Sequence, residues 1–332
     1  MTKLREALAG LNKGRKTSAV GDYREIPVGH GTIPTGLITL DRYIKGGLPR
    51  GRFSHLYGHK SAGKSTLALL TARNAQAIEP DKAVLYIDTE NAIDFEYAAA
   101  LGVDLSPDRF LYSAPDDGED AMLIATKLVA TGDVSLLILD SVTGMISEGR
   151  LENEPGKGMP AVTARLMSEF CQRLVRVQSK TNTATLILNH LTGTMKSDFH
   201  GNAIETPRGG RAVPNWASVE LLIKRANKPL EDGGEAVASE TTIALEKNKI
   251  GLPYRKTTLP MVFGHGFDPF ADAGEAAIDA GLVTVAGAFY TAGRMKFQGR
   301  AKFFDYLGRH PELIQNIRGT VIDGVTFEWP EE

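Results

Sequence analysis

The segment from residue 58 to residue 66 limits the possible folds most, because it contains the complete pattern G-x-x-x-x-G-K-[ST]. Gly58, Gly63, Lys64 and Ser65 occupy the four fixed positions. An apolar run at residues 53–57 precedes the pattern, and a helical pattern follows it. A strand, a glycine-rich turn and a helix N-terminus in this order direct backbone N–H groups and helix-dipole charge at one point. The sequence therefore predicts a phosphate-binding loop.

Two side chains of this loop have expected roles of their own. Lys64 is expected to reach the β- and γ-phosphates of a nucleotide, and the hydroxyl of Ser65 is expected to bind Mg²⁺. The residues expected to contact the nucleotide here are Gly58, His59, Lys60, Ser61, Ala62, Gly63, Lys64, Ser65 and Thr66.

Short apolar runs that alternate with helical patterns predict an α/β fold with a mostly parallel central sheet. Strands are expected at residues 53–57, 83–87, 110–113, 135–139, 184–188, 218–223, 242–245 and 257–263. The last three follow one another with little helix between them, which predicts an antiparallel edge. After Gly264 a helical stretch near 276–280, a hairpin-like stretch at 288–298 and a helix from Arg300 predict a small α+β domain.

The chain is expected to have an arm and linker at 1–32, an ATPase core at 33–263 and a small C-terminal domain at 264–332. Residues 2–11 place four apolar side chains on one face of an expected helix: Leu4, Ala7, Leu8 and Leu11. Residues 12–22 are polar and contain glycine, which is typical of a flexible link. The helix either docks on a neighbouring subunit or packs on its own core, and the sequence leaves both possibilities open.

The composition restricts the partners and the compartment. The formal net charge of −2 gives no overall attraction to nucleic acid, so any DNA contact must come from local patches. Cys171 is the single cysteine, which excludes an internal disulfide and favours a reducing compartment. No apolar run is long enough to span a bilayer, and the N-terminus lacks the apolar region of a signal peptide. We therefore expect no membrane contact and a cytoplasmic location.

Carboxylates follow two of the expected strands. Asp140 ends an apolar run, at the position where ligands bind in α/β sheets, and it suits the acid that holds the Mg²⁺ shell of such enzymes. Asp88 and Glu90 follow the strand expected at 83–87, and Glu90 is a candidate to polarise the water that attacks the γ-phosphate. The alternative is that either acid only caps the next helix, and the spacing does not decide between these roles.

Two segments are predicted to be irregular and exposed. Residues 153–160 contain prolines and glycines that exclude a helix or a central strand. The second segment runs from His190 to Gly210 and is longer than an ordinary connection. Basic and apolar side chains are interleaved in it, at Met195, Lys196, Phe199, His200 and Arg208, and Arg211 follows directly. Such a segment suits single-stranded nucleic acid, but an ordinary surface loop is the alternative that composition alone favours.

As an ordered set, these motifs resemble the RecA family of DNA strand-exchange proteins over about residues 33–310. Besides the phosphate loop, the segments that support the resemblance are 35–41, 46–52, 88–97, 101–104, 139–141, 209–210 and 247–250. The resemblance implies a RecA-like ATPase that binds ATP and Mg²⁺, forms a right-handed helical filament on single-stranded DNA, samples double-stranded DNA and exchanges strands. It also implies that the N-terminal arm is the polymerisation element.

The resemblance also implies roles for individual side chains. Glu90 would be the catalytic carboxylate, acting with Lys64, and His190 would sense the γ-phosphate. Lys247 and Lys249 would reach the ATP of a neighbouring subunit. The adenine would stack on Tyr97 with Asp94 beside its amino edge, and Ser65 and Asp140 would hold the metal.

Two DNA-binding loops of the family correspond to residues 153–160 and 191–210 of this chain. Arg165 matches an arginine that contacts phosphate from the helix after the first loop. The residues expected at DNA are Met159, Arg165, Lys196, Phe199, Arg208, Gly209, Gly210 and Arg211.

Several departures from the bacterial pattern favour a viral or otherwise divergent recombinase, acting in a bacterial cell or in the cytoplasm of an infected host. His190 stands where bacterial members have Gln, Pro160 where they have Met, and Asn215 replaces an aromatic residue that links subunits. The acidic tail is reduced to Glu328, Glu331 and Glu332. The alternatives are a related ring-forming helicase or motor, and an ATP-switched mediator that binds single-stranded DNA with little catalysis. A small-molecule phosphoryl-transfer enzyme is disfavoured, because the sequence has no recognisable acceptor pocket or arginine-rich lid.

Overall fold

The computed structural model describes residues 2–14, 31–145, 160–197 and 203–330. Within these residues a ten-stranded sheet lies at the centre, in the order β12-β11-β10-β9-β3-β7-β6-β4-β5 with β8 paired to β7. Its strands are β3 (Phe53–Gly58), β4 (Ala83–Asp88), β5 (Phe110–Ser113), β6 (Val134–Asp140), β7 (Ala184–Ser197), β8 (Ala203–Pro207), β9 (Ala217–Asp232), β10 (Glu235–Asn248), β11 (Lys256–Val262) and β12 (Gly266–Phe267).

The directions of the strands confirm the predicted mixed sheet. The strands β5, β4, β6, β7, β3 and β9 run parallel to one another, whereas β10, β11 and β12 each pair antiparallel with the strand before them. Parallel neighbours require crossover connections, and the helical stretches predicted between the first five strands supply them. As a result, the carboxyl ends of β3, β4, β6 and β7 meet at one edge of the sheet.

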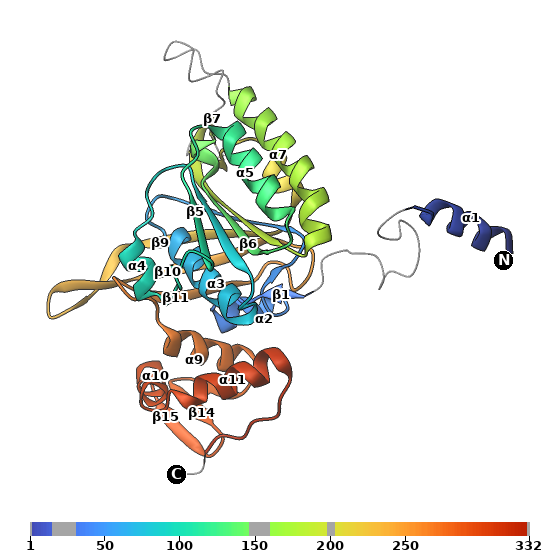
Figure 1. Cartoon of the computed structure of the whole chain (residues 1–332). Helices are drawn as coiled ribbons and strands as arrows, with labels where there is room; N and C mark the ends of the chain where they lie inside the picture. The colour runs from blue at the N-terminus through green and yellow to red at the C-terminus, as the bar shows by residue number, and fades with distance from the viewer. Residues whose placement is uncertain (1, 15–30, 146–159, 198–202, 331–332) are drawn as a thin grey trace.

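Helices cover both faces of this sheet, and each face has its own apolar core (Figure 1). On one face lie α2 (Ile38–Tyr43), α3 (Lys64–Ile78) and α4 (Phe95–Ala100). On the other lie α5 (Gly118–Val129), α7 (Pro160–Thr181) and α8 (Ala212–Trp216), with the short 3-10 helix η1 (Val142–Gly144) after β6. Two small strands, β1 (Thr32–Ile33) and β2 (Leu48–Pro49), pair with each other beside the sheet.

The C-terminal residues form a separate small layer with a third apolar core, as predicted. A three-stranded antiparallel sheet of β13 (Val283–Ala286), β14 (Phe289–Ala292) and β15 (Met295–Gln298) packs with α9 (Pro269–Asp279), α10 (Arg300–Arg309) and α11 (Glu312–Asp323). Asp272 on α9 joins this layer to the core, because its carboxylate accepts hydrogen bonds from the backbone N–H groups of Ile38 and Thr39. A side chain of the C-terminal layer thus caps the first turn of α2.

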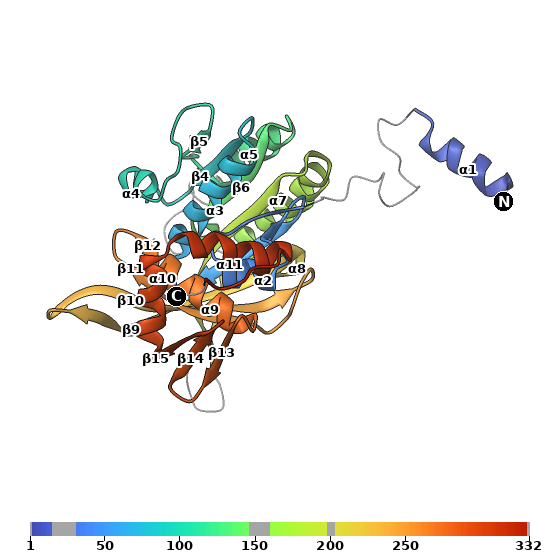
Figure 2. The ribbon, with the colours of Figure 1, turned by 90° about the horizontal axis from the view of Figure 1, so that it is seen from below.

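The N-terminal helix α1 (Thr2–Asn12) confirms the predicted helix, and it lies apart from the sheet in both views (Figures 1 and 2). Leu4 and Leu11 are 60% and 54% exposed. This exposure leaves the apolar face without a core of its own in the described part of the chain. Docking on a neighbouring subunit stays a prediction.

The expectation of an irregular segment from His190 to Gly210 was wrong for residues 190–197 and 203–207, which are strands, whereas residues 208–210 form a turn. β7 continues to Ser197 and pairs with β8 as an antiparallel hairpin. β9 and β10 are also much longer than predicted and form a hairpin that projects from the sheet (Figure 2). Both hairpins contain polar sequences whose composition is typical of loops. They form strands because each strand is stabilised by pairing with its neighbour, which the composition of one segment does not reveal. No helix in the described ranges is both long and apolar enough to cross a bilayer.

Candidate nucleotide site and nucleic-acid interface

The predicted phosphate loop connects β3 to α3. Gly63 precedes α3 with φ 98° and provides no capping side chain, so the first amides of α3 remain directed at the loop. At Gly58 a Cβ atom would lie 2.2 Å from the carbonyl oxygen of Ile223 on β9, which only glycine avoids. Ser61 and Lys60 are exposed on the rim. This backbone can hold the phosphate groups of a nucleotide.

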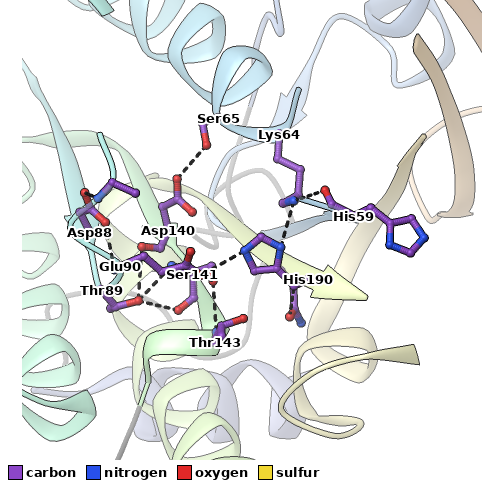
Figure 3. A network of polar contacts seen from close by, with 12 residues as sticks. His59, Lys64, Ser65, Asp88, Thr89, Glu90, Asp140, Ser141, Thr143 and His190 are labelled. Atoms are coloured by element: carbon purple, nitrogen blue, oxygen red, sulfur yellow. Dashed lines mark hydrogen bonds and ion pairs between the residues drawn. The ribbon is translucent and has the colours of Figure 1, made fainter. Parts of the chain in front are cut away.

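Lys64 points into the loop rather than into solvent (Figure 3). Its ammonium donates to the carbonyl oxygens of His59 at 2.7 Å and Gly58 at 3.2 Å. Burial lowers the pKa of Lys64 to about 8, while the nearby charges of Asp140 and Glu90 oppose that shift. Because two of its partners are neutral carbonyls, this cation is available to an incoming phosphate.

Ser65 and Asp140 come together as predicted for a metal site. The Ser65 hydroxyl donates to Oδ2 of Asp140 at 3.0 Å (Figure 3). The Tyr86 hydroxyl donates to the same oxygen at 2.7 Å. Burial raises the pKa of Asp140, and these two hydrogen bonds lower it. A hydroxyl and a carboxylate are hard oxygen ligands that suit Mg²⁺. Among the described residues no group of three or more His, Cys, Asp or Glu side chains could hold a metal ion.

Asp88 and Glu90 have different environments, which separates their roles. The buried Asp88 carboxylate accepts from the backbone N–H groups of Glu90, Ala92 and Ile93, so it organises the turn after β4. Glu90 instead extends toward the ends of β6 and β7, where the Ser141 hydroxyl donates to Oε1 (Figure 3). Asp88 therefore holds this turn and does not cap the next helix, α4, whose N-cap is Asp94, and Glu90 retains a carboxylate that faces the site.

His190, at the end of the parallel part of β7, lies between Lys64 and Glu90. Nδ1 is 3.2 Å from Nζ of Lys64, and Nε2 is 3.1 Å from Oε1 of Glu90. A lysine ammonium can only donate, so Nδ1 accepts and Nε2 bears the proton that is donated to Glu90. Burial and the charge of Lys64 lower the pKa of His190, and Glu90 opposes them. The ring is thus a neutral bridge between the phosphate loop and the candidate catalytic carboxylate.

The expected adenine side of the site lies around α4. The Tyr97 hydroxyl is 3.0 Å from Oγ1 of Thr66 in the phosphate loop. Asp94 is the N-cap of α4 and accepts from the backbone N–H of Tyr97 at 2.9 Å, so one of its oxygens is already engaged. Sequence reasoning missed Gly266, the first residue of β12, where a Cβ would meet Leu101 and Thr66. It also missed Tyr86 and Ser141, although both adjoin the motifs that it used.

Most of the described residues that are expected to bind DNA lie near the base of the β7–β8 hairpin. We call this base, where Arg208, Gly209 and Gly210 follow β8 beside His190, the hairpin foot. The backbone N–H of Arg208 donates to the carbonyl of His190 at 3.2 Å. Gly209 and Gly210 both have positive φ, and a Cβ would meet Val142 at 2.6 Å in the first case and Ala164 at 3.0 Å in the second. These two glycines therefore let the hairpin foot approach η1 and the first turns of α7.

The structure describes only some of the other residues that are expected to bind DNA. Arg208 and Arg211 are exposed after the hairpin, and Arg165 is exposed on α7 one residue from Ala164. Arg165 also lines a cavity of about 690 Å³ between α5 and α7, together with Arg173 and Arg176. Met159, Phe199 and the side chain of Lys196 lie outside the described residues, as do residues 153–159 of the first predicted loop.

Lys247 and Lys249 lie far from the chain's own phosphate loop. Lys247 pairs with Glu220 on β9, which pairs with His55 on β3, and Lys249 lies one residue beyond the pair of Asn248 with Val219. Gly58 is three residues beyond His55 along β3, or roughly 10 Å toward the opposite edge of the sheet. The Lys247 ammonium donates to the carbonyl of Pro214, and burial lowers its pKa. The structure thus does not bring these lysines to the Lys64 site of the same chain.

Comparison with known proteins gives a consistent result. Residues 3–268 match the family described as the RecA N-terminal domain. The chain is 37% identical to protein RecA of Deinococcus radiodurans over 295 residues, which is 88% of this chain and 80% of that protein. It is 36% identical to protein RecA of Thermus aquaticus over 323 residues, or 96% of this chain and 93% of the relative. Protein RecA of Geobacter sulfurreducens is 36% identical over 88% of this chain and 85% of its own length.

Proposed function

The chain belongs to the RecA family, and on this premise we propose that it is an ATP-dependent recombinase. It forms a helical filament on single-stranded DNA, pairs that strand with homologous duplex DNA and exchanges strands in the cytoplasm. The observation that supports this function most directly is the contact of His190 with both Lys64 and Glu90. The His190 side chain, at the foot of the hairpin that is expected to bind DNA, thereby contacts both the lysine expected to bind phosphate and the carboxylate expected to activate water.

The residues present fit ATP and Mg²⁺. Mg²⁺ would be held by Ser65 and Asp140 and would neutralise charge on the phosphates. Lys64 gives up its contacts with the loop carbonyls and donates to phosphate oxygens. Glu90 then accepts a proton from the attacking water, a role that contributes about 10²–10⁴-fold in enzymes of known mechanism.

His190 connects this chemistry to DNA. When Lys64 turns toward phosphate, the Nδ1 atom of His190 loses its donor, and the ring is free to reorient. The backbone carbonyl of His190 accepts a hydrogen bond from the N–H of Arg208 across the hairpin foot. Reorientation of His190 on nucleotide binding would therefore move the segment that contains Arg208, Gly209 and Gly210, so ATP and DNA would each favour the same state.

Each ATP is completed by two subunits in this proposal. The distance of Lys247 and Lys249 from the Lys64 site of their own chain supports a role for them at the ATP of a neighbouring subunit. The exposed apolar face of α1 supports a second subunit contact, with α1 as the polymerisation arm. ATP binding would then stabilise the filament, and hydrolysis would release it.

An ATPase assay combined with electron microscopy tests the proposal. Hydrolysis is measured with and without single-stranded DNA, and the same samples are imaged with a slowly hydrolysed ATP analogue. The proposal requires DNA-stimulated hydrolysis and helical filaments. Closed rings would support the helicase or motor alternative, and filaments with no hydrolysis would support an ATP-switched mediator.

A further inference from the structure

A chain of buried polar side chains crosses three neighbouring strands beside the nucleotide site. His55 on β3 is completely buried and has no part in the site described above. Its Nδ1 atom is 3.2 Å from Oε1 of Glu220 on β9, and its Nε2 atom is 3.3 Å from Nδ2 of Asn189 on β7. A polar ring in the centre of a parallel sheet is costly unless its hydrogen bonds are satisfied, so these contacts need an explanation.

Only one protonation state satisfies both contacts. The Glu220 carboxylate accepts hydrogen bonds, so Nδ1 of His55 bears the hydrogen, and the lone pair on Nε2 accepts from the Asn189 amide. Burial lowers the pKa of His55, which keeps the ring neutral, while Glu220 opposes this shift. The ring therefore acts as a donor toward β9 and as an acceptor toward β7.

Asn189 uses its second N–H and its amide oxygen at the hairpin foot. Its second N–H donates to the carbonyl of Arg208 at 2.9 Å, and its Oδ1 accepts from the backbone N–H of His190 at 2.8 Å. Exchanging the oxygen and nitrogen of this amide would set a donor against the His190 N–H and an acceptor against the Arg208 carbonyl. The hydrogen bond from His55 therefore belongs to a network that fixes Asn189 in one orientation.

The other end of the network reaches the strand that contains Lys247. Glu220 is paired with Lys247 across β9 and β10, next to an irregularity in the register between Leu245 and Lys247. The charge of Glu220 opposes the effect of burial on the pKa of Lys247. His55 thus stands between the strand pair that contains Lys247 and the residue that closes the hairpin foot.

We propose that His55 is a positioning residue that couples the Lys247 edge of the sheet to the foot of the β7–β8 hairpin by holding Asn189. This inference rests on the proposed function, and it explains how the edge expected at a neighbour's ATP and the hairpin expected at DNA move together. Breaking one hydrogen bond would leave a buried polar group unpaired, which is unfavourable, so the network changes as a unit.

Two substitutions of His55 and one neighbour test the inference. His55→Leu removes both hydrogen bonds, whereas His55→Gln keeps one donor and one acceptor. Phe53→Leu is the matched control, because Phe53 is buried two residues earlier on the same side of β3 and makes apolar contacts only. The readouts are the melting temperature, KM for ATP, and kcat with and without oligo-dT.

We expect His55→Leu to reduce the ratio of DNA-stimulated to unstimulated kcat by about tenfold, the equivalent of one buried hydrogen bond, with KM for ATP nearly unchanged. His55→Gln should retain most of the ratio, and Phe53→Leu should retain all of it. A folded His55→Leu protein with an unchanged ratio would overturn the inference, as would an equal loss in Phe53→Leu.

A second variant keeps the test decisive if His55→Leu does not fold. Asn189→Asp has nearly the same shape but presents oxygen to His55 Nε2 and to the Arg208 carbonyl, so loss of DNA stimulation there supports the inference and full stimulation overturns it. Failure of the proposed function looks different, because the unmodified protein itself would then show no DNA stimulation.

Discussion

His190 and Glu90 are a hundred residues apart in the chain, yet Nε2 of the histidine lies 3.1 Å from Oε1 of the glutamate. The contact exists because β4 and the parallel part of β7 both end at the edge of the sheet where the phosphate loop lies. It places a neutral ring against the carboxylate that is proposed to activate water. Separate substitutions of Asp88 and Glu90, the two acids at the end of β4, can therefore test which of them has this role.

Replacing Glu90 and Asp88 separately should give opposite results. Glu90→Gln should leave nucleotide affinity and the melting temperature nearly unchanged but reduce kcat by about 10²–10⁴-fold, because a general base is lost. Asp88→Asn should mainly destabilise the fold, by roughly 1–3 kcal/mol, because buried backbone N–H groups lose an acceptor. Single-turnover hydrolysis and thermal melting measure the two effects. Unchanged hydrolysis in Glu90→Gln with abolished hydrolysis in folded Asp88→Asn would assign the base to Asp88.

Replacing Lys64 should separate folding from nucleotide binding. Lys64→Ala should abolish ATP-dependent DNA binding, because the phosphate loop loses its cation. The fold should persist, since the hydrogen bonds of the Lys64 ammonium within the described part of the chain go to the carbonyls of Gly58 and His59 and to the ring of His190. Fluorescent-nucleotide titration and circular dichroism are the measurements, and ATP affinity equal to that of the unmodified protein would contradict the assignment.

Mixing two inactive variants should restore activity if ATP lies between subunits. Lys64→Ala subunits have intact interface lysines, and subunits with Lys247→Ala and Lys249→Ala have an intact phosphate loop. In mixed filaments the Lys64→Ala subunits can present Lys247 and Lys249 to the intact phosphate loops of the other variant, so part of the DNA-stimulated ATPase activity should return. Labels on both variants verify co-assembly. Co-assembled filaments that remain inactive would exclude the role of these lysines in a neighbouring subunit.

Removing the N-terminal arm should affect assembly rather than folding. Leu4 and Leu11 are exposed, so deleting residues 1–22 takes no described side chain out of the three apolar cores. We expect filament formation to fail and the melting temperature of the monomer to change by less than about 2 °C, because stability follows buried area. Light scattering and calorimetry measure the two. A large fall in melting temperature would mean that the helix packs on its own core.

The junction of the core with the C-terminal layer should make stability depend on pH. Burial raises the pKa of Asp41 to about 7 and that of Asp272 to about 6, from 3.8. The unfolded chain loses these protons near pH 4 and the folded chain retains them to pH 6–7, so the folded state binds more protons in between. The free energy of unfolding should therefore fall as pH rises from about 4 to 7, by up to about 1.4 kcal/mol per pH unit for each group.

Asp272→Asn should flatten part of that slope, because the substituted side chain keeps an acceptor for Ile38 or Thr39 but does not titrate. Asp279→Asn is the control, since Asp279 pairs with Arg42 across the same junction but is partly exposed. Urea denaturation at several pH values gives the slopes. Equal slopes for Asp272→Asn and the unmodified protein would show that Asp272 does not titrate in this range.

The sequence alone predicted the parts of this protein that depend on neighbours in the chain. The phosphate loop is a local motif, and the apolar runs located most of the sheet because a buried parallel strand needs continuous apolar residues. The order of the motifs predicted the RecA family, which the comparisons confirmed. The positions and contacts of Lys64, Ser65 and Asp140 in the structure agree with these local expectations, while their roles at nucleotide and metal stay predictions.

Only the tertiary structure decided which distant polar groups meet. The bridge through His190, the capping of α2 by Asp272 and the His55–Asn189 contact each join residues that are far apart in sequence. The two contacts that involve β7 depend on strand order and register, because a shift of one residue would turn a strand side chain to the other face of the sheet, and the capping of α2 depends on how α9 packs against it. The β7–β8 hairpin was missed for the same reason, because its strands are stabilised by each other and their composition is that of a loop. Local sequence thus indicates which chemical groups a motif supplies, whereas the packing of the sheet and its helices determines which distant side chains those groups contact.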